Sequence, residues 1–451
     1  MAVARRVFAL LISAALMSAT SGAARAASLL MISVDGLKPE YVLDADAHRL
    51  KIPYLRSLLR QGAYARGVIG VWPTVTYPSH TTLLTGVAPA EHGIYNNLEF
   101  DPKHNFAESW FWYAQQIRVP TLWQAARKAG LSTASVGWPA TVGAADVDYL
   151  IPEYWRIFRP TAELNPSDAH LMEAVSRPEG MLRDMQGRLG PYMLGNDPSP
   201  PGDEIKTRFA LDIVRARKPK FMTIHLSSLD EEQHLHGPFS TEADQDLEVI
   251  DGQLSQLCTA FFANDPKAVC LVVSDHGFVP ITHRVNLMSA FVHADLVQGG
   301  AWQAQPWGAG GMAAIMQRQP ADERTTAQVR ELLQSLKADP RNGIAEVLER
   351  DAIKQHGAFP EALFLVVMKL GFSIISDSTS TLVSEVQGTP GSHGFSPEYP
   401  EMRSSFFMSG AGIAPHRDLG VIDMRQIAPT VAQLLNVRLP DAKLAPLPVR
   451  Q

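Results

Sequence analysis

The residues best suited to chemistry in this chain are carboxylates, imidazoles and one hydroxyl that lie far apart in the sequence. They are Asp35, Thr76, Asp230, His234, Asp275, His276 and His393. Carboxylates together with imidazoles suit zinc better than magnesium, and a threonine hydroxyl is a nucleophile that a metal can activate. Two metals can stabilise both the attacking and the leaving oxygen of an in-line displacement. The set therefore predicts a two-metal phosphoryl-transfer site.

Spacing supports two pairs within this set. Asp230 and His234 lie four residues apart, so one helical turn or a tight loop would bring both side chains to one side. Taken alone, this pair fits a solvated polar loop equally well. Asp275 and His276 directly follow an apolar run, and Gly277 permits the sharp turn that both would need to reach a metal. A buried Asp-His pair without a metal would be costly to keep.

Thr76 and His393 are informative only together with the other candidates. Thr76 begins a segment with Pro78 in its first turn and Gly86 just past its end, which predicts a short helix. At the helix N-terminus, free N–H groups would favour a phosphate, although a lone threonine there is usually a cap. His393 lies in a glycine-rich loop, where a lone histidine could equally be a surface residue.

Apolar runs that end beside the acidic candidates indicate the fold class. Residues 28–34, 221–226 and 268–274 are predicted to be buried strands, and they end next to Asp35, near Asp230 and at Asp275. Helical patterns separate these strands, at 53–61, 121–130, 203–217 and 241–262. Alternation of this kind predicts an α/β fold with a mainly parallel sheet between helix layers. Ligands of such sheets bind beyond the carboxyl ends of the strands.

Residues 301–386 differ from the rest of the chain because they contain none of the candidate ligands. They show predicted strands at 313–316 and 363–368 and predicted helices at 325–338 and 345–351. We interpret the region as a small inserted α+β subdomain that caps the site. The catalytic domain would then comprise residues 27–300 and 387–451.

Composition and charge restrict the possible partners. The chain has 451 residues, of which 46% are hydrophobic and 19% charged, as expected for a globular protein with a large core. The net charge of -6 is spread without long runs, so we expect neither a nucleic-acid partner nor binding to an anionic membrane surface. The oligomeric state stays open.

The N-terminal segment has the pattern of an export signal. Arg5 and Arg6 precede the apolar residues 7–17, and small residues follow up to Ala26. This pattern predicts a cleavable signal peptide over residues 1–26 and export, most simply to a periplasm. The paired arginines also partly fit a twin-arginine signal, so the export route stays open. No later apolar run is long enough to span a membrane.

Cys258 and Cys270 could pair in an exported protein. Cys258 lies in a helix-like stretch and Cys270 begins a strand-like one, and pairing requires their Cα atoms to be close. We favour two buried free thiols, with pairing as the alternative.

With these segments in place, the chain resembles the type I phosphodiesterase/nucleotide pyrophosphatase family of the alkaline phosphatase superfamily. The matching segments, in order and spacing, are 33–36, 72–94, 230–238, 274–277 and 391–395, and the resemblance covers residues 28 to 437. It implies an alkaline-phosphatase-like three-layer sandwich. It also implies a zinc-dependent hydrolase of phosphodiester or pyrophosphate bonds that acts on a small-molecule substrate.

The resemblance also implies a role for each candidate. One zinc ion would be held by Asp230, His234 and His393. The other would be held by Asp35, Asp275, His276 and the oxygen of Thr76. Thr76 would be the nucleophile that becomes a phosphothreonine. Asn97 would hydrogen-bond a phosphoryl oxygen, although the adjacent Asn96 leaves that register open.

The substrate is less well specified than the reaction. Ser79 and Leu229 replace an asparagine and a proline that are usual in the family, which weakens the case for a nucleotide. Tyr95, Trp112 and Tyr154 are candidate substrate-binding residues that could stack on a base or enclose a quaternary ammonium group.

Three other functions are separable by sequence or assay. A sulfatase would need a modified cysteine or serine followed by an arginine, and residues 76–80 contain neither pattern. A phosphomonoesterase or phosphonate hydrolase with the same metals stays open. A non-catalytic, zinc-stabilised binding protein is remote, because a structural zinc site needs no nucleophile.

Overall fold

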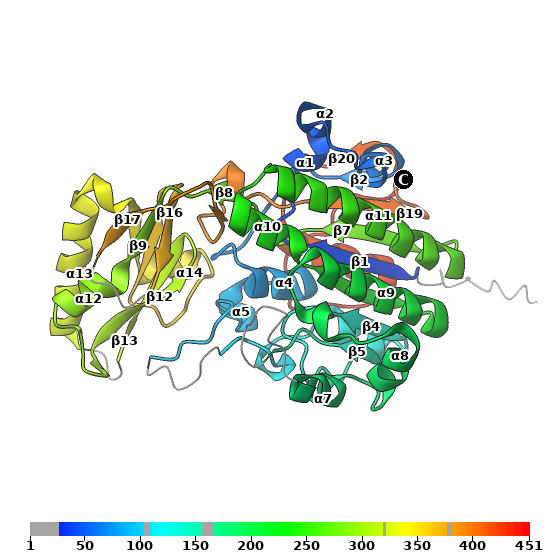
Figure 1. Cartoon of the computed structure of the whole chain (residues 1–451), viewed down its shortest axis with the longest axis horizontal. Helices are drawn as coiled ribbons and strands as arrows, with labels where there is room; N and C mark the ends of the chain where they lie inside the picture. Colours follow the sequence, from blue (N-terminus) through cyan, green and yellow to red (C-terminus); the bar gives the residue numbers. More distant parts are fainter. Residues whose placement is uncertain (1–26, 103–108, 156–165, 319–321, 377–380) are drawn as a thin grey trace, which may run out of the picture.

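A computed structural model describes residues 27–102, 109–155, 166–318, 322–376 and 381–451. The predicted signal segment, residues 1–26, lies outside the described residues. Two lobes lie side by side: the larger contains the central sheet, and the smaller is made of residues 283–385 (Figure 1). Among the helices within the described ranges, none is long and apolar enough to cross a membrane.

The central sheet has eight strands in the order β20-β2-β19-β7-β1-β6-β4-β5. The strands are β1 (Leu29–Val34), β2 (Ala63–Tyr64), β4 (Thr133–Val136), β5 (Tyr149–Ile151), β6 (Phe221–Leu226), β7 (Val269–Val273), β19 (Phe406–Gly410) and β20 (Arg417–Asp418). All neighbouring pairs are parallel except those of β19, which runs antiparallel to β7 and β2. This confirms the predicted mainly parallel sheet.

Helices cover both faces of this sheet, because the side chains of each buried strand alternate between two apolar layers. Leu30 and Ile32 of β1 belong to one hydrophobic cluster, and Leu29 and Met31 belong to the other. The first layer contains α3 (Pro53–Gln61), α9 (Pro200–Arg217) and α11 (Thr241–Asn264); the second contains α4 (Thr76–Thr85), α6 (Leu122–Lys128) and α15 (Ile427–Leu435). The predicted three-layer sandwich is confirmed.

The main sheet of the smaller lobe is antiparallel, whereas its second sheet contains a parallel pair of strands. The main sheet has the order β12-β13-β15-β14, with β12 (Ala304–Ala309), β13 (Met312–Gln317), β14 (Ile344–Glu349) and β15 (Phe364–Met368), and it is accompanied by α13 (Glu323–Ala338). The second sheet joins β9 (His283–Asn286), β16 (Phe372–Ile375) and β17 (Val383–Glu385), and in it β16 runs parallel to β9. β9 and α12 (Leu287–His293) precede residue 301, yet Val285 and Phe291 share the hydrophobic core of this lobe with Ile315 and Val366.

One predicted element in the smaller lobe is wrong. The sequence predicts a helix over residues 345–351, but β14 occupies Ile344–Glu349 and α14 (Arg350–Gln355) starts only at Arg350. Ala345 and Leu348 favour a helix locally. The pairing of β14 with β15, which is distant in sequence, overrides that preference. The strands predicted at 313–316 and 363–368 and the helix at 325–338 are confirmed.

The expectation of two free thiols is also wrong. Cys258 of α11 and Cys270 of β7 form a disulfide, with Cα atoms 5.9 Å apart. Both side chains are buried and lie in the same apolar layer, because Cys270 points from the sheet toward the helix that carries Cys258. The return of the chain from α11 into β7 brings them together. That packing is not visible in the spacing of the two cysteines.

The disulfide should contribute measurably to stability. Breaking it releases a loop closed by a 12-residue separation, so reduction is expected to lower the free energy of unfolding by about 3 kcal/mol. Urea titrations of the oxidised and reduced protein would measure the difference. Thiol titration of the oxidised, unfolded chain should detect no free thiol. Two reactive thiols per chain would contradict the pairing.

Candidate active site

The three candidate aspartates meet at the carboxyl end of the central strands. Asp35 follows β1, Asp275 follows β7, and Asp230 lies on α10 (Ser228–His236), which follows β6. The loop after β1 holds the three segments together: the backbone N–H of Gly36 donates to Asp275 Oδ1 at 3.1 Å, and Gln233 Nε2 of α10 donates to the Gly36 carbonyl at 3.0 Å. Gly36 has φ +68°, and a side chain there would collide with Gln233.

Thr76 is the first residue of α4, as the sequence predicts. Val75 is extended and Gly86 ends the helix in the left-handed region at φ +73°. The hydroxyl of Thr76 lies 3.5 Å from His276 Nε2. The N-terminal turn of α4 and the nucleophile candidate therefore lie beside the predicted metal ligands.

His276 lies at the centre of the predicted ligands. Its Nε2 is 3.1 Å from Asp275 Oδ2, 3.3 Å from Asp35 Oδ1 and 3.9 Å from Asp230 Oδ1. Two groups of ligand atoms, each within 4.8 Å of one another, share this histidine: Asp35, Asp275 and His276, and Asp230, His276 and His393. The structure thus brings the distant sequence segments to one place.

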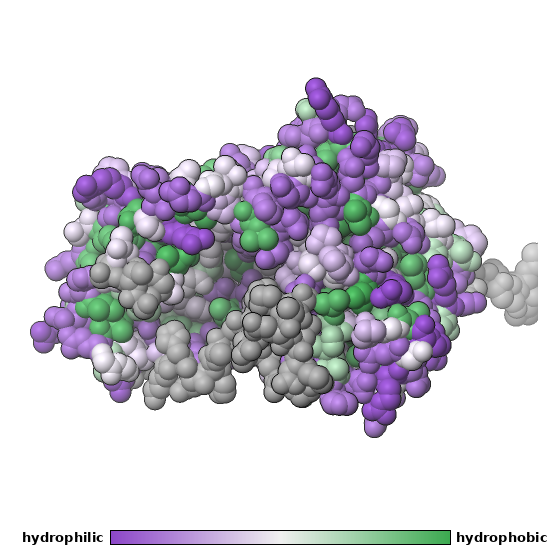
Figure 2. All heavy atoms as spheres, in the orientation of Figure 1, coloured by the Kyte–Doolittle hydropathy of each residue, from purple (hydrophilic) through white to green (hydrophobic). Residues whose placement is uncertain are grey.

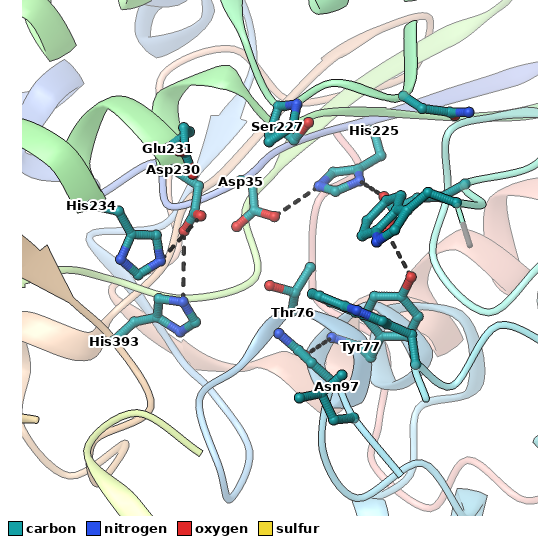
Figure 3. Close-up of a pocket in the computed structure, with 16 residues that line it drawn as sticks. Asp35, Thr76, Tyr77, Asn97, His225, Ser227, Asp230, Glu231, His234 and His393 are labelled. Atoms are coloured by element: carbon teal, nitrogen blue, oxygen red, sulfur yellow. Dashed lines mark hydrogen bonds and ion pairs between the residues drawn. The ribbon is translucent and has the colours of Figure 1, made fainter. Parts of the chain in front are cut away.

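His234 and His393 complete the cluster around Asp230 (Figure 3). The Nε2 atom of His234 lies 3.3 Å from Asp230 Oδ2, and that of His393 lies 3.7 Å from Asp230 Oδ1. The Nδ1 atoms face backbone carbonyls instead, that of Gly391 at 3.1 Å for His234 and that of Thr74 at 3.1 Å for His393. A carbonyl partner at Nδ1 leaves Nε2 as the atom that can ligate a metal.

Several carboxylate oxygens in the cluster are suited to cations. Asp35 Oδ1, Asp230 Oδ1 and Asp275 Oδ2 are buried and have no hydrogen-bond partner among the described residues. Burying ionised carboxylates is costly unless positive charge compensates them. Carboxylate and imidazole atoms converging in this way fit zinc.

The pKa shifts have the signs expected for a cluster of buried metal ligands. Burial, with the charge of Asp275 next, raises the pKa of Asp35 and of Asp230 well above 3.8. Burial also lowers the pKa of His276 and of His393 well below 6.5. The two imidazoles are therefore neutral at pH 7, which is the form that binds metals.

A cavity of about 310 Å³ opens beside the cluster, and its lining includes Asp35, Thr76, Asn97, Asp230 and His393. Figure 2 shows the surface hollowed between the two lobes, and Figure 3 shows Thr76 and Asn97 pointing toward the same space as the aspartates.

The structure distinguishes the two neighbouring asparagines. Asn97 lines the cavity, and its Oδ1 accepts a hydrogen bond from the backbone N–H of Tyr77 at 2.9 Å. This leaves Nδ2 of Asn97 as the group that can donate to a ligand. Asn96 is turned away, since its Nδ2 donates to the Gly308 carbonyl of the smaller lobe at 2.8 Å.

The aromatic wall of the cavity is formed by Tyr77, Trp110 and Trp155. The substrate-binding candidates Tyr95, Trp112 and Tyr154 are not among its lining residues. Trp112 packs behind the wall, with its ring centroid 5.6 Å from that of Trp110 and 4.5 Å from that of Trp155. Tyr154 packs on Trp112 in turn, and the Tyr95 hydroxyl accepts a hydrogen bond from Arg118.

Two residues of the site have no counterpart among the sequence predictions. His225 Nε2 lies 2.9 Å from Asp35 Oδ2, and His225 Nδ1 lies 3.1 Å from Glu153 Oε2. The other oxygen of Glu153 accepts a hydrogen bond from the Tyr77 hydroxyl at 2.6 Å. The only sequence signal for His225 is a polar residue inside the apolar run of β6, and Glu153 has none.

Comparisons with known proteins agree with this geometry. The model of the family "Type I phosphodiesterase / nucleotide pyrophosphatase" matches residues 29–396. Human ectonucleotide pyrophosphatase/phosphodiesterase family member 1 is 24% identical over 55% of this chain and 23% of its own length. A venom phosphodiesterase from Naja atra is 24% identical over 58% of this chain and 28% of its own length. The matches thus span about a quarter of the length of these relatives.

Among solved structures, murine ectonucleotide pyrophosphatase/phosphodiesterase 5 superposes with a TM-score of 0.64 at 17% identity, covering 93% of this chain and 97% of its own. The same protein is also known as an inactive threonine-to-alanine variant in complex with AMP. This likeness supports the shared fold. By the extent of the family match, the chain belongs to the type I phosphodiesterase/nucleotide pyrophosphatase family.

Proposed function

We propose that this protein is an exported, zinc-dependent hydrolase that cleaves phosphodiester or pyrophosphate bonds through a covalent phosphothreonine on Thr76. The observation that carries the proposal is the Thr76 hydroxyl, 3.5 Å from His276 in a cluster where three buried carboxylate oxygens accept no hydrogen bond from the described residues. The inactive threonine-to-alanine variant of the murine relative supports an essential threonine.

Asp230, His234 and His393 would hold one zinc ion, supported by the contacts of both histidines with Asp230. Asp35, Asp275, His276 and the oxygen of Thr76 would hold the second, supported by the convergence of the first three side chains and the nearby Thr76 hydroxyl. When bound, the two ions supply positive charge that favours the ionised threonine hydroxyl and offsets charge on the oxygens at phosphorus.

Side chains of the protein carry out the attack on phosphorus and bind the phosphoryl group. Thr76 Oγ1 forms the new bond to phosphorus while the bond to the leaving oxygen breaks. Nδ2 of Asn97 donates to a phosphoryl oxygen, held in that orientation by the bond between its Oδ1 and Tyr77 N–H. The positive end of the α4 helix dipole favours the same anion. Water then attacks the phosphothreonine, which releases the phosphate product and restores the hydroxyl.

The substrate of this reaction is a small phosphoric diester or pyrophosphate, consistent with the family. The aromatic wall of Tyr77, Trp110 and Trp155 offers a surface on which a flat or cationic leaving group can rest. The AMP complex of the murine relative supports nucleotides as the first class to test.

Replacing Thr76 tests the covalent mechanism. Thr76→Ala should reduce kcat for bis-p-nitrophenyl phosphate by at least about 1,000-fold, because no hydroxyl remains to attack phosphorus. Thr76→Ser is the matched control and should keep measurable turnover. Trapping with acid should yield a phosphorylated chain only when residue 76 carries a hydroxyl. Full turnover by the alanine variant would remove Thr76 from the mechanism.

The metal assignment predicts about two zinc ions per chain by elemental analysis of carefully prepared protein. Chelation should abolish hydrolysis and lower Tm, because the buried carboxylates would lose their counter-charge, and added zinc should restore both. His393→Ala should lower the bound zinc toward one per chain. A metal content of one or less in active wild-type protein would contradict the two-metal site.

Zinc affinity should depend on pH in a defined direction. Because the pKa of Asp35 and of Asp230 is raised, these two groups hold more protons in the folded, metal-free protein than in the unfolded chain between pH 3.8 and the raised values, so their contribution to stability is lost as pH rises through the raised values. Zinc displaces these protons, and its apparent affinity should therefore rise with pH over the same range. Chelator competition from about pH 5 to about pH 8 would measure this. An affinity independent of pH would contradict the assignment.

Comparing the rates of diester and monoester hydrolysis distinguishes a diesterase from a phosphomonoesterase. We expect bis-p-nitrophenyl phosphate to be cleaved faster than p-nitrophenyl phosphate, with kcat/KM as the measure. A faster reaction with the monoester would assign the protein to the alternative activity.

A further inference from the structure

A chain of four buried side chains connects a metal ligand to the residue beside the nucleophile. It runs from Asp35 through His225 and Glu153 to Tyr77, with distances between the contacting polar atoms of 2.9, 3.1 and 2.6 Å. Figure 3 labels Asp35, His225 and Tyr77 of this chain. We propose that His225 and Glu153 are positioning residues that hold Asp35 and the Thr76–Tyr77 turn in the arrangement that zinc binding and attack require. The proposal rests on the proposed function and adds residues that lie outside the ligand set.

His225 determines which oxygen of Asp35 faces the cluster. Its Nε2 takes Oδ2 at 2.9 Å, whereas Oδ1 has no hydrogen-bond partner and lies 3.3 Å from His276 Nε2. The carboxylate therefore cannot rotate without losing a buried hydrogen bond. Hydrogen bonds to the second oxygen of a ligand are a known means of orienting it toward the metal.

The imidazole of His225 is itself held from several sides. Its Nδ1 lies 3.1 Å from Glu153 Oε2 and 3.2 Å from the Gly137 carbonyl, and its ring packs edge-on against His80 at a centroid distance of 4.4 Å. The side chain is almost fully buried. These contacts fix the rotamer of His225, so its ring can hold the Asp35 carboxylate in one orientation.

Glu153 links this array to the nucleophile. Its second oxygen accepts from the Tyr77 hydroxyl, and Tyr77 is bonded through its backbone N–H to Asn97. Glu153 is thus connected both to the Asp35 carboxylate, through His225, and to the segment of Thr76, Tyr77 and Asn97, through Tyr77. Glu153 follows β5, which is the edge strand of the central sheet on the side of β6. A single carboxylate therefore couples the metal side and the phosphate side of the cavity.

Zinc affinity and turnover of three variants test this proposal. His225→Leu should weaken zinc binding by about 10- to 100-fold in chelator competition. It should also lower kcat more than it raises KM. His225→Gln should partly restore both, because a glutamine amide can donate to Asp35. Tyr77→Phe should lower kcat with little change in zinc affinity, since it cuts only the link toward Thr76.

His92→Leu is the matched control. His92 is a fully buried histidine whose side chain has polar contacts with Thr82, with the backbone N–H of Ile94 and with the backbone of Pro78, and none of these partners is a predicted metal ligand. It should lower Tm without changing the zinc affinity of the folded protein. If His225→Leu lowers Tm as this control does but keeps wild-type zinc affinity and kcat, the positioning role is wrong.

The outcomes also separate this proposal from the proposed function. A Thr76→Ala protein that is inactive, together with a His225→Leu protein that behaves as wild type, would sink only the positioning role. A Thr76→Ala protein with full turnover would sink the proposed mechanism, and the zinc affinity of His225→Leu would then still report whether His225 orients Asp35.

Discussion

Buried negative charge is the constraint on which the rest of this site depends. Asp35, Asp230 and Asp275 converge because β6, β1 and β7 are neighbours in one parallel sheet and end at the same edge. Within the part of the chain that the structure describes, each presents a buried oxygen that accepts no hydrogen bond. In a low-dielectric interior such an arrangement is stable only with protons or cations nearby. The buried carboxylates therefore require compensating positive charge, at the same place where a phosphoryl group would add negative charge.

The predicted ligands are held in fixed orientations. Five of the seven have a polar contact away from the centre of the cluster: Asp275 with the Gly36 N–H, His234, His276 and His393 with backbone carbonyls, and Asp35 with His225. Most of these contacts use main-chain groups of loops that are anchored by strands or helices. The fold therefore fixes the orientation of these side chains before a metal ion binds.

Residue type and spacing selected candidate ligands that the structure brings together, whereas they predicted local structure less well. These candidates could be chosen from the sequence because carboxylates and histidines that follow apolar strands are the residue types and positions that a metal site requires. The same reasoning failed at residues 345–351, where helix-forming residues pair as a strand, and at Cys258 and Cys270, where tertiary packing decides the pairing. It also missed His225 and Glu153, because their role exists only through contacts between segments that are distant in sequence.

The substrate wall illustrates the same limit. Tyr95, Trp112 and Tyr154 have the same kinds of side chain as Trp110 and Trp155, and no pattern distinguishes an aromatic residue facing a cavity from one packed behind it. Asn96 and Asn97 are adjacent in the sequence, and which of the two faces the cavity depends on a shift of one residue. That register is set by the hydrogen bond of Asn96 to the Gly308 carbonyl on β12.

The loop that carries His393 has a consequence for the architecture. The His393 carbonyl accepts from the N–H of Gly311 in the turn between β12 and β13, and the Gly394 N–H donates to the Thr74 carbonyl, each at 2.9 Å. A side chain at Gly310 would collide with the His393 carbonyl. The two lobes are therefore structurally interdependent, because removing the smaller lobe would remove one of the backbone contacts that hold the loop of His393.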